Sequence, residues 1–243
     1  MIELSDLSKR YKRYVIPLNT LKSFLINYRQ YRRESSMVDE LSVIEHLTLT
    51  ISDGEIFCMI GKNGSGKSTL AKLIAGTAEP TSGHVKVSGK IVPFLELGVA
   101  FSTELSGRDN VMLNGVMLGL TRAYLKEKMD DIFRYAQVED FIDTPMKYYS
   151  SGMQMRLAFS IGMHADGDVY IFDEILAVGD ANFQKKCMDS FQQLIQKKKT
   201  IILITHDLGT VKRYADRALL LQESGYRILE KQEIQMLQME DLL

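Results

Sequence analysis

The chain has 243 residues, 45% of them hydrophobic, which is enough for one large domain or a core with a small subdomain. Its formal net charge of −1 excludes a strong overall field toward nucleic acid or an acidic surface. The two cysteines, Cys58 and Cys187, lie too far apart for a metal or redox motif, and no apolar run approaches the ~20 residues that span a bilayer. We expect one domain over residues 1–243, without a signal peptide.

Strand-like runs recur along the chain, at residues 2–7, 47–51, 55–61, 84–88, 168–174, 200–206 and 217–222. Two of them, "VYIF" and "IILIT", are apolar on both faces, as strands of a covered parallel sheet must be. Helical patterns fall between several runs, and Gly225 breaks the last segment into a hairpin. This alternation predicts an α/β fold.

Residues from about 105 to 165 have few β-branched runs and several helical patterns. Ser106 with Asp109 resembles a helix-start box before "NVMLNGVMLGL". Farther along, "AYLKEKMDDIFRYA" repeats its apolar residues at the three-to-four spacing of one helix face. We therefore expect a helical subdomain inserted into the α/β core.

Two further segments flank this core. Residues 9–33 carry eight basic and no acidic residues, and Leu18, Leu21, Leu25 and Tyr28 share one helical face after Pro17. We interpret an insertion at about 12–40 as a basic amphipathic element that contacts a membrane surface or a partner, against the alternative of a solvated face over ordinary packing. A short helix is expected at about 231–243.

A glycine-rich loop between an apolar strand and a helical run matches the pattern G-x-x-x-x-G-K-[ST]. Glycines let backbone N–H groups turn inward around phosphate oxygens, and the following helix adds its positive N-terminal end. Lys67 would reach the β- and γ-phosphates, and Ser68 would bind Mg²⁺. The nucleotide-binding residues predicted here are Gly61, Lys62, Asn63, Gly64, Ser65, Gly66, Lys67, Ser68 and Thr69.

Polar residues end two other apolar strands. Asp173 and Glu174 follow "VYIF", and carboxylates there emerge at the carboxyl edge of the sheet, where ligands bind α/β proteins. Asp173 fits a partner of Mg²⁺, and Glu174 fits a base that orients a water molecule. His206 ends "TIILIT" at the same edge, where a γ-phosphate would lie.

Taken in order, the glycine-rich loop, Ser150-Ser151-Gly152, Asp173-Glu174 and His206 resemble the ATP-binding subunits of ABC transporters, over most of the chain. The resemblance implies a P-loop NTPase fold with a RecA-like core, an antiparallel β subdomain and an inserted helical subdomain. It also implies that Ser150, Ser151 and Gly152, at the start of a helix, contact the γ-phosphate held by a second copy of the chain.

The same resemblance assigns two more positions. Asp180 falls where the family has a loop at its dimer interface. Tyr11 falls where the family stacks an aromatic ring on adenine, although a packing role fits Tyr11 equally well. The family's Q-loop glutamine is missing between residues 94 and 106, and Ser102, Glu96 and Glu104 remain open as replacements.

Three segments, "YSSGM", "FLELGVAFSTELSGRDN" and "DEILAVGDANFQKKC", are similar to the ATPase subunits of polysaccharide exporters. That branch implies ATP and Mg²⁺ as cofactors, a separate transmembrane permease in two copies, a lipid-linked polysaccharide, and a peripheral location on the cytoplasmic face of the inner membrane. No nucleic-acid partner is expected. The alternatives are an ABC ATPase for a lipid, drug or peptide, a non-transport ABC-type ATPase, and a nucleotide-binding regulator without turnover.

Overall fold

The computed structural model describes residues 1–13, 39–95, 101–173, 179–222, 225–238 and 240. Its strands are β1 (Ile2–Arg13), β2 (Asp39–Ile51), β3 (Ile56–Gly61), β4 (Ser82–Val87), β5 (Ile91–Phe94), β6 (Val169–Asp173), β7 (Thr200–Ile204), β8 (Arg217–Gln222) and β9 (Gly225–Glu230). Its helices are α2 (Lys67–Ile74), α3 (Gly107–Met117), α4 (Arg122–Ala136), α5 (Ser151–His164), α6 (Ala181–Gln196), α7 (Leu208–Tyr214) and α8 (Lys231–Met236), with short 3₁₀ turns η1 (Glu139–Phe141) and η2 (Met146–Tyr148).

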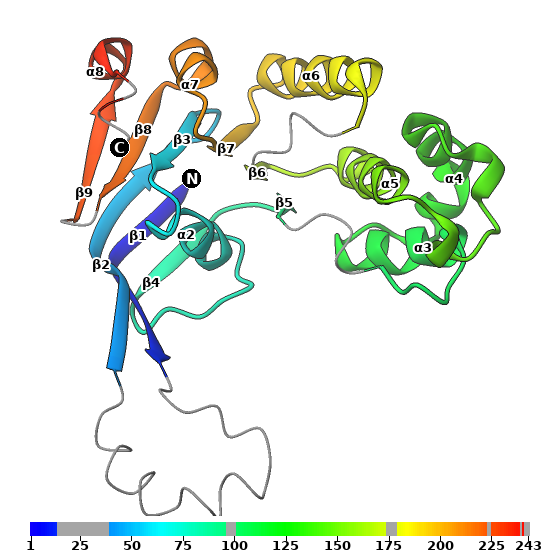
Figure 1. Cartoon of the computed structure of the whole chain (residues 1–243), viewed down its shortest axis with the longest axis horizontal. Helices are drawn as coiled ribbons and strands as arrows, with labels where there is room; N and C mark the ends of the chain where they lie inside the picture. Colours follow the sequence, from blue (N-terminus) through cyan, green and yellow to red (C-terminus); the bar gives the residue numbers. More distant parts are fainter. Residues whose placement is uncertain (14–38, 96–100, 174–178, 223–224, 239, 241–243) are drawn as a thin grey trace, which may run out of the picture.

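The core is a six-stranded sheet in the order β5-β6-β7-β3-β8-β9 (Figure 1). All neighbours pair in parallel except β8 and β9, which form the hairpin predicted around Gly225. Val169 to Phe172 of β6 and every residue of β7 are buried, as their two-sided apolar runs predicted, and every residue of β3 is buried as well. Along β3, Cys58 packs toward α6 and α7, whereas Phe57 packs toward α2 and the second sheet.

β5 was not predicted. It is only four residues long and contains Pro93, which cannot donate a backbone hydrogen bond to a neighbouring strand. The structure tolerates Pro93 because β5 lies at the edge of the sheet and pairs only with β6.

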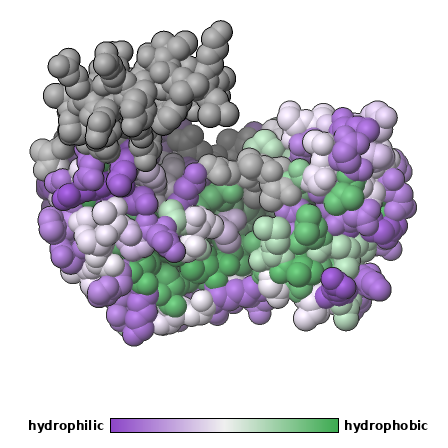
Figure 2. Space-filling view, turned by 90° about the horizontal axis from the view of Figure 1, so that it is seen from below, coloured by the Kyte–Doolittle hydropathy of each residue, from purple (hydrophilic) through white to green (hydrophobic). Residues whose placement is uncertain are grey.

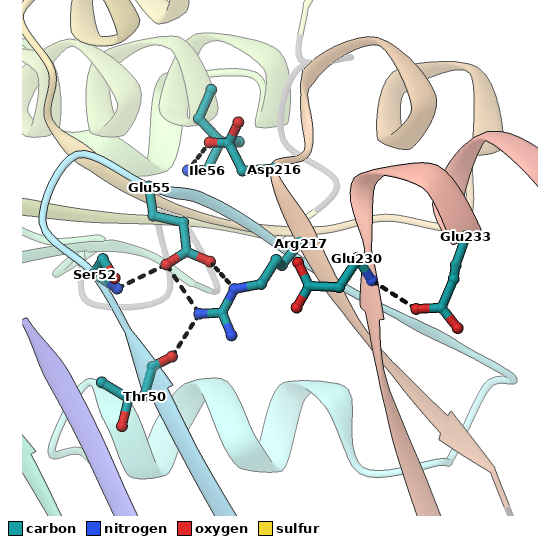
Figure 3. Close-up of polar contacts among 8 residues, drawn as sticks. All are labelled: Thr50, Ser52, Glu55, Ile56, Asp216, Arg217, Glu230 and Glu233. Atoms are coloured by element: carbon teal, nitrogen blue, oxygen red, sulfur yellow. Dashed lines mark hydrogen bonds and ion pairs between the residues drawn. The ribbon is translucent and has the colours of Figure 1, made fainter.

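A second, antiparallel sheet has the order β2-β1-β4 and packs its apolar face over α2 and the core. A polar cluster joins it to the six-stranded sheet (Figure 3). Arg217 of β8 donates to both carboxylate oxygens of Glu55 at 2.8 and 3.0 Å and to the Thr50 carbonyl of β2 at 2.6 Å. The Ser52 N–H also donates to Glu55. This cluster fixes the end of β2 against β3 and β8.

Helices α3, α4 and α5 with η1 and η2 form a helical lobe beside the sheet (Figure 1), in the region expected at about 105–165. Ser106 caps α3 by accepting a hydrogen bond from the Asp109 N–H, as its sequence pattern predicted. The predicted apolar face of α4 is buried through Leu125, Met129 and Ile132. The lobe therefore has a core of its own.

The remaining sequence predictions concern the two ends of the chain. α8 begins at Lys231 and ends at Met236, because the backbone of Leu237 leaves the helical region with φ −56° and ψ 140°. The helix expected at about 231–243 therefore does not continue through Leu237, and residues 239 and 241–243 lie outside the described residues. Most of the basic insertion, residues 14–38, lies outside the described residues. Within the described part of the chain, no helix combines the length and apolar character that crossing a bilayer requires.

Candidate functional site

The loop between β3 and α2 depends on glycine at three positions. Gly61, Gly64 and Gly66 have φ angles of 143°, 81° and 100°, in the region that side chains disfavour. A Cβ atom at Gly61 would lie 2.3 Å from the Leu221 carbonyl oxygen, whereas one at Gly64 would meet no atom of the described residues within 4 Å. Gly61 thus lets the loop pack tightly against β8, and Gly64 leaves the loop surface open to a ligand.

The start of α2 has the properties of an anion site. Gly66 provides no side-chain cap, and the first turn contains no acidic residue, so the helix N-terminus keeps its partial positive charge. The buried Lys67 ammonium donates to the carbonyl oxygens of Gly61 and Lys62, both at 2.7 Å. Among the described residues, the buried Ser65 hydroxyl has no hydrogen-bond partner. The loop therefore fits a phosphate group.

The two predicted metal ligands lie together. Ser68, in the first turn of α2, has its hydroxyl oxygen 3.4 Å from a carboxylate oxygen of Asp173, although 105 positions separate them in the sequence. Asp173 ends β6, and the parallel order β6-β7-β3 places the carboxyl ends of these strands at one edge. A hydroxyl and a carboxylate are oxygen ligands of the kind that Mg²⁺ prefers.

His206 follows β7, the strand between those that carry Asp173 and the glycine-rich loop, and it is exposed at the same edge. The next residue, Asp207, caps α7 by accepting hydrogen bonds from the N–H groups of Gly209 and Thr210, both at 3.0 Å. The Thr210 side-chain hydrogen bond is the main cause that lowers the pKa of Asp207. Asp207 was not predicted from the sequence, although an Asp directly before "LGTVKRY" is a capping signal.

Ser150 begins α5 as its cap and accepts a hydrogen bond from the Met153 N–H at 3.2 Å. Ser151 is exposed, and a Cβ atom at Gly152 would meet only the Ser150 hydroxyl oxygen, at 3.9 Å, among the described atoms outside this helix's own backbone, so this helix start is also open. The preceding Tyr149 is buried and donates to the Phe141 carbonyl. In Figure 1 the start of α5 lies in the helical lobe, well apart from α2, so one chain does not bring the two predicted halves of the site together.

Other predicted residues have defined surroundings. Tyr11 lies on β1, where it pairs with Leu41 of β2. The Tyr11 side chain is 41% exposed, and the Lys9 ammonium lies 4.9 Å from the centroid of the Tyr11 ring. Of the Q-loop candidates, Ser102 pairs through its backbone with Asn110, and Glu104 forms an ion pair with Lys147 at 2.8 Å.

Asp180 caps α6 and lies 3.7 Å from Arg156 of α5. Arg156 is a second residue that sequence analysis missed, because only the fold brings it to Asp180. Two predicted residues, Glu96 and Glu174, lie outside the described residues.

Comparisons with known proteins agree with this arrangement. A family model described as "ABC transporter" matches residues 44–177. The O-antigen export system ATP-binding protein RfbB of Myxococcus xanthus is 43% identical over 227 residues, which are 93% of this chain and 52% of that protein. RfbB of Klebsiella pneumoniae is 40% identical over 76% of this chain and 75% of its own length. The teichoic acids export ATP-binding protein TagH of Bacillus anthracis is 34% identical over 90% of this chain and 39% of its own length.

The chain thus spans about half the length of the Myxococcus relative. Among solved structures, the dimeric ATP-binding cassette MJ0796 bound to ADP and Pi superposes with a TM-score of 0.73 at 19% identity, over 95% of this chain and 99% of that one. The structure of an ATP-binding subunit of an ABC transporter superposes with a TM-score of 0.72 at 22% identity, over 94% of this chain and 89% of that one. These likenesses concern the fold, and they confirm the predicted α/β class with its antiparallel and helical parts.

Proposed function

The chain belongs to the ABC transporter family, and from this premise we propose that it binds and hydrolyses ATP to drive export of a lipid-linked polysaccharide. The observation that carries the proposal is the convergence of three separate segments at one sheet edge. The glycine-rich loop fits a phosphate, Ser68 lies 3.4 Å from Asp173, and His206 follows the strand between them.

Each residue has a role that follows from its chemistry. The loop N–H groups and the Lys67 ammonium bind phosphate oxygens, which requires Lys67 to exchange its present carbonyl partners for the nucleotide. Ser68 and Asp173 would hold Mg²⁺, which when bound neutralises phosphate charge. His206 contacts the γ-phosphate, and Glu174 orients the attacking water.

We further propose that two copies of the chain complete the site. The open start of α5, with Ser150, Ser151 and Gly152, is suited to an anion but lies away from α2 of its own chain (Figure 1). A second copy would bring this helix start to the phosphates, and Asp180 would lie at the same interface. Tyr11 remains a candidate for contact with the adenine ring.

The names of the relatives, which are ATP-binding proteins of O-antigen and teichoic acids export, support a choice of partners. We propose a separate transmembrane permease in two copies, with this chain bound peripherally on the inner face of the membrane. A surface suited to a protein partner exists on the helical lobe, where Figure 2 shows exposed hydrophobic residues. Independently of the picture, α3 exposes three large hydrophobic side chains, Leu113, Val116 and Met117, the last 69% exposed.

A Glu174→Gln replacement in the source organism tests the proposal, with the exposed Glu127→Gln of α4 as the matched control. We expect lipid-linked glycan to accumulate on the inner side of the membrane and surface polymer to disappear in Glu174→Gln cells only. ATPase activity of the purified chain is measured in parallel. Lost ATPase activity with unchanged glycan on both sides would refute the polysaccharide cargo and favour a lipid, drug or peptide.

A further inference from the structure

Arg156 connects three elements that are far apart in the sequence. It lies in the second turn of α5, six residues after Ser150, and its side chain is only 19% exposed. Its Nε donates to the carbonyl of Ala136, the last residue of α4, at 3.1 Å. Its Nη1 lies 3.7 Å from Asp180, and its guanidinium carbon lies 6.0 Å from the ring centroid of Phe183. Arg156 thus touches α4 and the beginning of α6 from α5.

Asp180 uses its two carboxylate oxygens differently. Oδ1 accepts hydrogen bonds from the N–H groups of Asn182 and Phe183, both at 3.0 Å, and so caps α6. Oδ2 faces Arg156. Because the cap is complete without Arg156, the ion pair is not needed for α6 to begin at Ala181. Its effect is to fix the position of Asp180 relative to α5.

A separate set of contacts holds the helical lobe against α6. Lys186 donates to the Tyr135 carbonyl at 2.8 Å and lies 4.2 Å from the Tyr135 ring centroid. The Tyr135 hydroxyl lies 2.5 Å from the Ser190 hydroxyl. These contacts do not involve Arg156, so we expect the lobe to stay docked when Arg156 is replaced.

We propose that Arg156 is a positioning residue that fixes the spacing between two contact surfaces of one subunit, the start of α5 and Asp180. The inference rests on the proposed function, which assigns both surfaces to the interface between two copies. A rigid link matters there because both surfaces must meet the partner copy together. Arg156 acts on dimer closure and turnover, and it leaves phosphate binding by the distant glycine-rich loop unchanged.

The test uses the full chain with Arg156→Gln, Arg156→Lys and Asp180→Asn, and with Arg134→Gln as a control from an exposed ion pair on α4. We expect Arg156→Gln to lower kcat about tenfold while KM for ATP changes less than about twofold. Arg156→Lys keeps the positive charge and restores part of kcat. In an Asp180→Asn background, Arg156→Gln has no further effect, because Arg156 acts through Asp180.

Two more readouts separate this inference from the proposed function. ATP-dependent dimerisation is measured by sedimentation in a Glu174→Gln background, where slow hydrolysis keeps ATP bound. Absence of ATP-dependent dimers from Glu174→Gln alone would contradict the proposed function. Equal dimerisation with and without Arg156→Gln would overturn the role of Arg156. Without nucleotide, the Asn182 and Phe183 amides should exchange hydrogen equally fast in Arg156→Gln and in the native chain, because the Asp180 cap does not need Arg156. Faster exchange would mean that Arg156 stabilises the start of α6, and would overturn the proposed link.

Discussion

Replacing Arg217 by methionine tests the polar cluster that joins the two sheets (Figure 3). The change removes two hydrogen bonds to Glu55 and one to the Thr50 carbonyl, and leaves the Glu55 carboxylate with the Ser52 N–H. The Glu55 side chain is 8% exposed, so water cannot replace the lost donors, whereas Arg217 is 24% exposed.

Removing one partner of a buried ion pair costs about 3–5 kcal/mol, and the partial exposure of Arg217 places the expected loss near the lower end, at about 3 kcal/mol. For a chain of this size, 1 kcal/mol corresponds to about 2–4 °C in Tm, so Arg217→Met should lower Tm by about 6–12 °C. Thermal unfolding followed by circular dichroism measures the change. The exposed Arg134→Met, which loses only a surface pair, should shift Tm by less than about 2 °C.

A second variant examines the cause of this loss. Glu55→Gln combined with Arg217→Met removes the stranded charge while keeping an acceptor for Ser52, so it should recover part of the lost stability. A single Arg217→Met variant that melts within about 2 °C of the native chain would refute the reasoning. So would a double variant that is less stable than Arg217→Met.

Three further predictions follow from the site and the core. Lys67→Ala should weaken binding of a fluorescent ATP analogue more than about tenfold, since a charge-assisted contact to phosphate is lost, and equal affinity would contradict the phosphate role. Burial raises the pKa values of Cys58 and Cys187 to about 12. Iodoacetamide should therefore label the folded chain slowly at pH 8 and the urea-unfolded chain quickly. Rapid labelling of the folded chain would contradict this, because it would mean that the thiols are accessible. Asp207→Ala should lower the free energy of unfolding in urea by about 1 kcal/mol at pH 7. Because the pKa of Asp207 is lowered below 3.8, this difference should persist above about pH 4 and fade as the pH drops through the lowered pKa. A difference that does not depend on pH would exclude the carboxylate cap.

Local patterns made much of the site predictable. The glycine-rich loop has a fixed spacing because positive φ angles and backbone approach to phosphate demand glycine at particular positions, and the structure has them at Gly61, Gly64 and Gly66. The carboxylate of Asp173 could be placed at the sheet edge because a parallel strand buried on both faces is recognisable in the sequence as a continuous apolar run. The roles of Glu174 and Ser150 stay predictions, the first because Glu174 lies outside the described residues and the second because it requires another copy.

The sequence by itself determined the fold class, the glycine-rich loop, the helical lobe and the cap of α3 at Ser106, since these depend on periodicity, turn residues and caps within a few positions. Only the tertiary structure decided that Pro93 belongs to an edge strand and that Arg156 lies near Asp180. The physical reason is that such contacts depend on strand order and on the packing of the lobe against α6. Strand order and lobe packing leave no signal in the sequence next to the residues that make these contacts.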